Sequence, residues 1–148
     1  MLLLANESHK LIPQPVQHSG IWIYGSQRAS VAADFNLDGC LDLAVTQNAG
    51  PVVHLENQSD GIGLRVELQT ERANTFAIGA NVWAQYQDGS FDPPPPVVAG
   101  SGYWSQNNLA PLLAPRSEIE KVHVSWPGGA DTTVIVQPGA QTVRTVQQ

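Results

Sequence analysis

The sequence is divided into short apolar, often β-branched runs separated by Gly, Pro and Asn, and this pattern most constrains the fold. LRVEL at residues 64–68 and KVHVSW at residues 121–126 alternate apolar with polar side chains, as half-buried strands do. No segment sustains the 3.6-residue period of an amphipathic helix. Only residues 107–114 favour a helical turn, which Pro111 and the following Pro115 keep short. The pattern therefore predicts an all-β protein.

The predicted strands fall on both sides of a polar stretch, ENQSDGIG, at residues 56–63. They are residues 2–5, 29–35, 41–46, 52–56, 64–69, 80–87, 97–100, 121–126, 133–137 and 142–146. The last two are β-branched and separated by PGAQ, so they are predicted to pair as a hairpin. The polar stretch predicts a boundary between an N-terminal unit, residues 1–58, and a C-terminal unit, residues 63–148.

Composition excludes several classes of protein. The chain has 148 residues, of which 42% are hydrophobic and 14% charged, a globular and not a disordered composition. The net charge of −6, with seven scattered basic residues, argues against a nucleic-acid partner. No run approaches the roughly 20 apolar residues of a membrane span. The single cysteine excludes an internal disulfide.

The stretch DFNLDGCLD at residues 34–42 concentrates oxygen-bearing side chains at positions 1, 3, 5 and 9 of a tight loop. These side chains belong to Asp34, Asn36, Asp38 and Asp42. The Cys40 carbonyl at position 7 adds an oxygen, and Gly39 permits the tight bend. An all-oxygen set of this kind suits Ca²⁺ better than Mg²⁺, which requires stricter octahedral geometry. The alternative is a solvated turn, since Asp, Asn and Gly favour turns in any case.

The loop differs from an EF-hand, which requires a Glu at position 12 and flanking helices. Position 12 is Val45 here, and the flanking segments SVAADF and LDLAV are predicted to be strands. The pattern thus predicts a strand–loop–strand calcium site. The thiol of Cys40 is predicted to be a small buried or half-buried side chain beside the loop, and not a metal ligand.

The segment ASVAADFNLDGCLDLAVTQN resembles the FG-GAP, or VCBS, repeat of integrin-like β-propellers, and the resemblance covers residues 2–57. It implies calcium ligation by the side chains of Asp34, Asn36, Asp38 and Asp42 and by the Cys40 carbonyl. Asn36 replaces an Asp that is common in the family, which should weaken the affinity. Because a propeller requires several blades, one repeat cannot close a propeller.

The C-terminal part resembles the ASPIC/UnbV domain through three motifs. They are N-x-x-A-I-G-A at residues 74–80, G-Y-x-S-Q-N at residues 102–107 and W-P-x-G at residues 126–129. After Asn107 the family has a stretch like LHFGLG, whereas this chain reads LAPLLAPRSEI. Together the two resemblances imply a blade-like antiparallel sheet with a calcium loop, packed on a C-terminal β-sandwich.

An extracellular or cell-surface location is expected, because ASPIC/UnbV domains often follow FG-GAP repeats in secreted proteins. The start MLLLANES lacks the basic region and long apolar run of a signal peptide. The chain is therefore expected to be a fragment of a longer protein.

No residue is assigned a catalytic role, because the histidines lie in unrelated contexts and no nucleophile has an evident base. A sugar-binding surface is favoured instead at Tyr103, Trp104, Gln106 and Asn107, where rings stack on sugars and amides bond hydroxyls. Tyr103 and Trp104 are expected on opposite sides of a strand, with Trp104 exposed. Trp126 and Trp83 are expected in the sandwich core.

The sequence thus predicts a non-catalytic, calcium-dependent binding or adhesion module, with a glycan or an extracellular protein as partner. One alternative is an enzyme or a biosynthetic accessory domain. The other is a self-assembling module, either a homo-oligomer that uses the strand near Leu2 or part of a larger propeller, because one blade leaves two unpaired edges.

Overall fold

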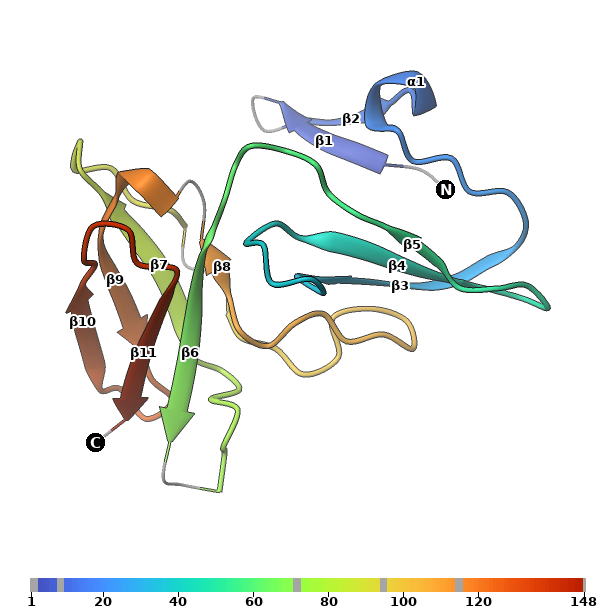
Figure 1. Cartoon of the computed structure of the whole chain (residues 1–148). Coiled ribbons are helices and arrows are strands. Elements are labelled where there is room, and N and C mark those ends of the chain that lie inside the picture. The colour runs from blue at the N-terminus through green and yellow to red at the C-terminus, as the bar shows by residue number, and fades with distance from the viewer. Residues whose placement is uncertain (1–2, 8–9, 71–72, 94–95, 114–115, 148) are drawn as a thin grey trace.

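The structure is a computed structural model that describes residues 3–7, 10–70, 73–93, 96–113 and 116–147. Their regular secondary structure is almost entirely β-strand, which confirms the predicted fold class. The strands form a two-stranded ribbon and three sheets of three strands each (Figure 1).

The N-terminal ribbon pairs β1 (Leu3–Glu7) with β2 (Lys10–Gln14) in antiparallel register. β2 was not predicted, because its run KLIPQ is short and contains Pro13. A short helix, α1 (Val16–Ser19), follows and ends at Gly20. A two-stranded ribbon is at best marginally stable on its own.

The second sheet, here called the blade, has the order β3-β4-β5 and is antiparallel. Its strands are β3 (Gln27–Ala33), β4 (Asp42–Gln47) and β5 (Val53–Leu55). Ala33 pairs with Asp42, so the acidic loop is the connection between β3 and β4, as predicted. A bulge interrupts the pairing of β3 with β4 between Gln27 and Ser30.

The C-terminal part, here called the sandwich, packs two three-stranded sheets around one core. One sheet contains β10 (Asp131–Ile135), β9 (Ile119–Ser125) and β7 (Asn81–Tyr86). The other contains β11 (Thr142–Gln147), β6 (Leu64–Thr70) and β8 (Leu112–Leu113). A 3-10 turn, η1 (Arg116–Glu118), precedes β9. The buried core consists of Leu64, Val66, Ala77, Ala80, Val82, Ala84, Val97, Leu113, Ile119, Val122, Val124, Trp126 and Val143.

The predicted hairpin of the last two strands is wrong. β10 pairs with β9, whereas β11 pairs in parallel with β6 in the opposite sheet. The chain between them crosses from one sheet to the other, so that Val134 and Val143 contact the same core from two sides. Core packing therefore overrides the local turn signal.

Two further predictions differ from the structure. Residues 97–100 form no strand, although Val97 is buried and exchanges backbone hydrogen bonds with the segment before β7. Residues 107–113 are not helical, because β8 lies there and pairs with β6.

The blade lies beside the sandwich, and the chain between β7 and β8 extends from the sandwich beneath β3 (Figure 1). The backbone N–H of Gly63 donates to the carbonyl of Gly39 over 2.8 Å, which joins the segment before β6 to the acidic loop. The described N-terminal residues contribute nothing to the sandwich core. Burial of apolar surface in the sandwich is thus the main source of stability.

Candidate functional site

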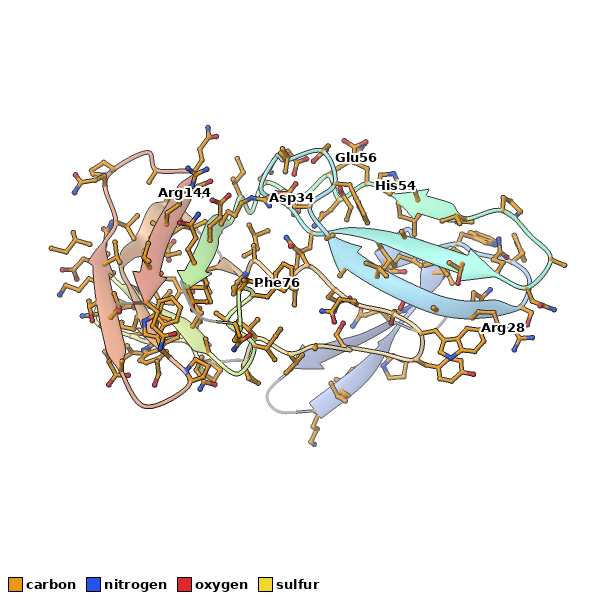
Figure 2. All side chains as sticks on the ribbon, turned by 90° about the horizontal axis from the view of Figure 1, so that it is seen from below. Arg28, Asp34, His54, Glu56, Phe76 and Arg144 are labelled. Atoms are coloured by element: carbon orange, nitrogen blue, oxygen red, sulfur yellow. The ribbon has the colours of Figure 1, made fainter. Side chains whose placement is uncertain are left out.

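The acidic loop lies at the junction of the two parts. Figure 2 places Asp34 at the end of the blade that faces the sandwich, and Arg28 toward the opposite end. The loop backbone is tight, with a φ of 64° at Leu37 and 90° at Gly39. A Cβ at position 39 would lie 2.7 Å from Cγ2 of Ile62. Only glycine fits both requirements.

Asp34 is the most constrained ligand candidate, because its side chain is 1% exposed. Its Oδ2 accepts hydrogen bonds from the Gly39 N–H at 3.1 Å and from Nη2 of Arg65 at 2.6 Å. Its Oδ1 is buried and has no hydrogen-bond partner. A buried carboxylate oxygen without a partner is unfavourable, and a cation beside it would remove the penalty.

Asn36 and Asp38 face each other across the loop. The Asn36 amide donates to Oδ2 of Asp38 at 2.8 Å, and its Oδ1 accepts the Asp38 N–H at 3.1 Å. Oδ1 of Asp38 accepts the N–H of Cys40 at 2.7 Å. This backbone hydrogen bond, followed by the Asn36 amide, lowers the pKa of Asp38 below its ordinary value. The charged carboxylate is thus the favoured form.

Asp42 ties the loop to the segment that follows β5. Its buried carboxylate accepts the N–H of Phe35 at 3.1 Å and the N–H of Asn57 at 2.9 Å. Nε2 of His54 lies 3.9 Å from the same carboxylate. Asp42 therefore closes the loop through these two backbone contacts.

The thiol of Cys40 is buried beside the loop, with Sγ 3.5 Å from the carbonyl oxygen of Ser59. Burial, with the charge of Asp38 as the next cause, raises its pKa above the ordinary value. A thiol that stays protonated is a poor metal ligand and nucleophile. Its carbonyl is the group that the loop pattern places toward a cation.

The chemistry of the loop fits calcium in two respects. The donor set consists of hard oxygens, and Oδ1 of Asp34 is buried without a partner. The described residues hold no group of three or more His, Cys, Asp or Glu side chains placed to bind a metal. The fit therefore rests on Asp34 and on the chemistry of the donors.

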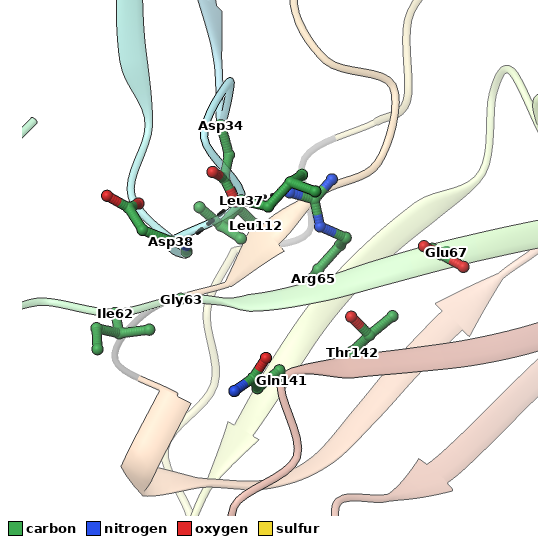
Figure 3. Close-up of a pocket in the computed structure, with 11 residues that line it drawn as sticks. Asp34, Leu37, Asp38, Ile62, Gly63, Arg65, Glu67, Leu112, Gln141 and Thr142 are labelled. Carbon is green, nitrogen blue, oxygen red and sulfur yellow. Dashed lines mark hydrogen bonds and ion pairs between the residues drawn. The ribbon is translucent and has the colours of Figure 1, made fainter. Parts of the chain in front are cut away.

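A hollow of about 420 Å³ separates the loop from the sandwich (Figure 3). Asp34 and Asp38 lie on one side, and Arg65 points from β6 toward Asp34. Glu67, which is paired with Arg144 at 2.6 Å, lines the hollow farther along β6. Arg65 was not among the predicted site residues, although it is the one basic residue of β6.

The predicted sugar-binding rings lie on a turn, and not on a strand as expected. Gly102 and Ser105 close the turn, and Tyr103 and Trp104 stack on the same side. Their ring centroids are 5.3 Å apart and the ring planes differ by 8°. Tyr103 is 69% exposed and Trp104 is 85% exposed. Trp104 has a φ of 53°, an unfavourable conformation for a bulky residue.

The amides of Gln106 and Asn107 bond to backbone groups. Gln106 accepts the N–H of Gly100. Oδ1 of Asn107 accepts the N–H of Ala32 at 2.9 Å, and the N–H of Asn108 donates to the Ala32 carbonyl at 3.1 Å. The structure thus places these two predicted sugar-binding residues where they hold the loop and fasten it to the free edge of β3.

Residues 70–148, more than half of the chain, match the family described as ASPIC and UnbV. The chain belongs to the ASPIC and UnbV family. The match starts at the last residue of β6 and contains the three motifs of the sequence analysis. No curated protein matches the chain. In the described part of the chain, no helix is long and apolar enough to span a membrane.

The motifs of the ASPIC/UnbV domain stabilise turns and the core. Nδ2 of Asn74 donates to the Ile78 carbonyl at 2.8 Å, and Oδ1 of Asn74 accepts the Ile78 N–H at 3.0 Å. These bonds close a turn in which Ala77 has a φ of 51°. Trp126 is 3% exposed, as predicted for a core residue, and its Nε1 donates to Oγ1 of Thr132 at 2.8 Å. These motif residues therefore have structural roles.

Trp83 is not a core residue of the ASPIC/UnbV domain, contrary to the prediction. It is half-buried on the outer face of β7, where its ring stacks on His123 with centroids 5.3 Å apart. Its neighbours Val82 and Ala84 are fully buried, so alternation along the strand turns Trp83 outward. The ring centroid of Phe91 lies 6.1 Å from that of His123, so that Trp83, His123 and Phe91 form an aromatic cluster on this face. The alternation of NVWAQY would have identified this face from sequence.

Proposed function

We propose that this protein is an extracellular, non-catalytic module that binds carbohydrate in a calcium-dependent manner. Its blade is proposed to be a single FG-GAP/VCBS-like repeat. The observation that carries the proposal is the buried, unpaired Oδ1 of Asp34 inside an all-oxygen loop between two strands of the blade. No other described side-chain nitrogen or oxygen is buried without a partner.

The proposed calcium ligands are the side chains of the predicted set and one carbonyl. They are Asp34, Asn36, Asp38, Asp42 and the Cys40 carbonyl. Arg65 holds the second oxygen of Asp34, as an outer partner that orients a metal-bound carboxylate does. Calcium would neutralise the loop and stabilise the two strands that flank it.

The loop is coupled to the exposed rings through β3. Ala32, which binds Asn107 and Asn108, is two residues before Asp34. The loop that carries Tyr103 and Trp104, here called the ring-bearing loop, is attached to this end of β3. Fixing Asp34 therefore also fixes the point of attachment of the ring-bearing loop. This short path supports a dependence of sugar binding on calcium.

The stacked rings of Tyr103 and Trp104 support carbohydrate as the ligand class. Flat, exposed aromatic faces stack on the C–H faces of sugars. Trp104 keeps an unfavourable positive φ although its ring is almost fully exposed, so core packing does not explain its place. Strained residues of this kind are enriched at functional sites.

Replacement of Trp104 with glycine tests the proposal. Sugar affinity should fall about tenfold or more, because buried Trp contacts dominate binding energies. The melting temperature should stay the same or rise, because glycine accepts a positive φ. Glycan-array screening followed by calorimetry, with and without EDTA, provides the measurement.

Phe76→Ala is the matched control, because Phe76 is 63% exposed and lies on the sandwich away from Arg28 (Figure 2). It should leave sugar binding unchanged. Retained binding by the Trp104 variant would exclude the ring surface, and binding that is insensitive to EDTA would exclude calcium dependence.

Self-assembly is a second candidate function, favoured by exposed apolar side chains of the N-terminal part. They are Leu11, Ile12, Trp22, Tyr24, Phe35, Leu37, Leu41 and Val52. Trp22 and Tyr24 contact each other, with ring centroids 5.8 Å apart. β1 pairs with β2 along one edge, and we place the contact on these exposed side chains.

Sedimentation velocity at micromolar concentration should then show a dimer or a larger species, since buried apolar area drives association. A Trp22→Ser and Tyr24→Ser double variant should dissociate it. A monomeric wild type would refute self-assembly and leave sugar binding as the only proposed function.

A further inference from the structure

A groove of about 310 Å³ runs between the blade and the ring-bearing loop. β3 contributes Arg28 and Ser30 to its lining, and the loop contributes Ser101, Tyr103 and Ser105. Both walls are held in place by the bonds of Asn107 and Asn108 to Ala32. The groove is therefore built by the contact of the two parts and exists in neither alone.

Arg28 is a free cation in this groove. Among the described residues, no carboxylate lies within 4.0 Å of its guanidinium, whereas Arg65, Lys121 and Arg144 all have acidic partners. Arg28 is exposed and lies next to the bulge between Gln27 and Ser30. Bulges often re-aim a side chain beside a functional site.

The remaining lining supplies groups that bond sugar hydroxyls. The hydroxyls of Ser30 and Ser105 have no hydrogen-bond partner in the described part of the chain, while Ser101 accepts the N–H of Asn107 at 2.6 Å. Tyr103 lines the groove and stacks on Trp104, so the ring pair stands at its edge. Hydroxyls, one guanidinium and a flat aromatic pair thus meet at one place.

We propose that this groove binds an acidic oligosaccharide, with Arg28 bonded to a carboxylate or sulfate of one sugar and the ring pair stacked on another. The inference rests on the proposed sugar-binding function and adds the class of sugar. A planar guanidinium binds carboxylate and sulfate in a bidentate manner. Because the protein carries a net charge of −6, a single local cation must provide the selectivity for an acidic ligand.

Sugar is favoured over an acidic peptide by the lining. An acidic peptide needs a row of cations or an exposed strand edge, and the groove has one arginine while Asn107 and Asn108 already bond the β3 edge at Ala32. An acidic sugar needs one cation, hydroxyl partners and an aromatic face, which the groove supplies.

The test compares hyaluronan hexasaccharide with chitin hexasaccharide by calorimetry in calcium, since both contain N-acetylglucosamine and only hyaluronan is acidic. Wild-type protein should bind hyaluronan more tightly. Arg28→Gln should weaken hyaluronan binding about tenfold, the loss expected for a charged hydrogen bond, and leave chitin binding unchanged. Lys10→Gln, which removes an exposed charge from β2, should change neither.

Equal affinity for the two sugars, or an Arg28→Gln variant that binds both as wild type does, would overturn the acidic-sugar inference. If Trp104→Gly still lost chitin binding, the proposed function would survive that result. If wild type bound neither sugar, the proposed function would fail together with the inference. Hexaglutamate binding as tight as hyaluronan binding would make the ligand an acidic peptide and overturn the choice of sugar.

Discussion

Calcium is expected to raise the melting temperature of this protein, and EDTA to reverse the increase. A ligand that binds only the folded state adds about 2.7 kcal/mol of stability at about a hundredfold excess over its Kd. The physical source is the acidic loop, where Oδ1 of Asp34 is buried without a partner. Differential scanning calorimetry over a calcium series measures the effect.

Asp38→Ala should abolish the calcium response, because it removes an exposed, fully ionised carboxylate of the loop. Asp88→Ala is the matched control. Asp88 is also an exposed turn carboxylate whose pKa is lowered by local hydrogen bonds, in its case from Ser90, but it lies in the sandwich. Its loss should leave the response intact. A melting curve that chelation does not change would falsify the structural role of calcium.

Trp126→Ala is expected to lower the free energy of unfolding by about 3–5 kcal/mol, the usual loss for a truncated core Trp. Trp126 is 3% exposed, packs in the sandwich core and donates a hydrogen bond to Thr132. The variant leaves a cavity and a hydroxyl without its partner. Urea unfolding followed by fluorescence measures the change in midpoint.

Trp83→Ala provides the comparison within the same domain. Trp83 is half-buried on the outer face of β7, so its truncation opens no internal cavity and should cost clearly less than the truncation of Trp126. Equal losses for the two variants would contradict the assignment of Trp83 to the outer face.

The local features of this protein were predictable from its sequence. Alternating runs such as LRVEL identified β6, because strand periodicity depends only on neighbouring residues. The loop between Asp34 and Asp42 was identified in the same way, since the spacing of oxygens and Gly39 determines its tight backbone. The turn residues of the ASPIC/UnbV motifs also act locally, as Asn74 does on Ile78.

The arrangement of these features required the tertiary structure. The sequence predicted a hairpin of β10 with β11, but packing of Val134 and Val143 against a common core sends β11 to the opposite sheet. The pairing of Arg65 with Asp34 joins residues 31 positions apart, and no local pattern encodes such a contact.

The sequence by itself determined the all-β class, the acidic loop and the family motifs, because each depends on residues a few positions apart. Only the tertiary structure decided that Asn107 binds the edge of β3 and that Arg28 and Tyr103 line one groove. These features arise from contacts between the blade and the sandwich. Their geometry follows from how two separately encoded sheets pack, which no local propensity specifies.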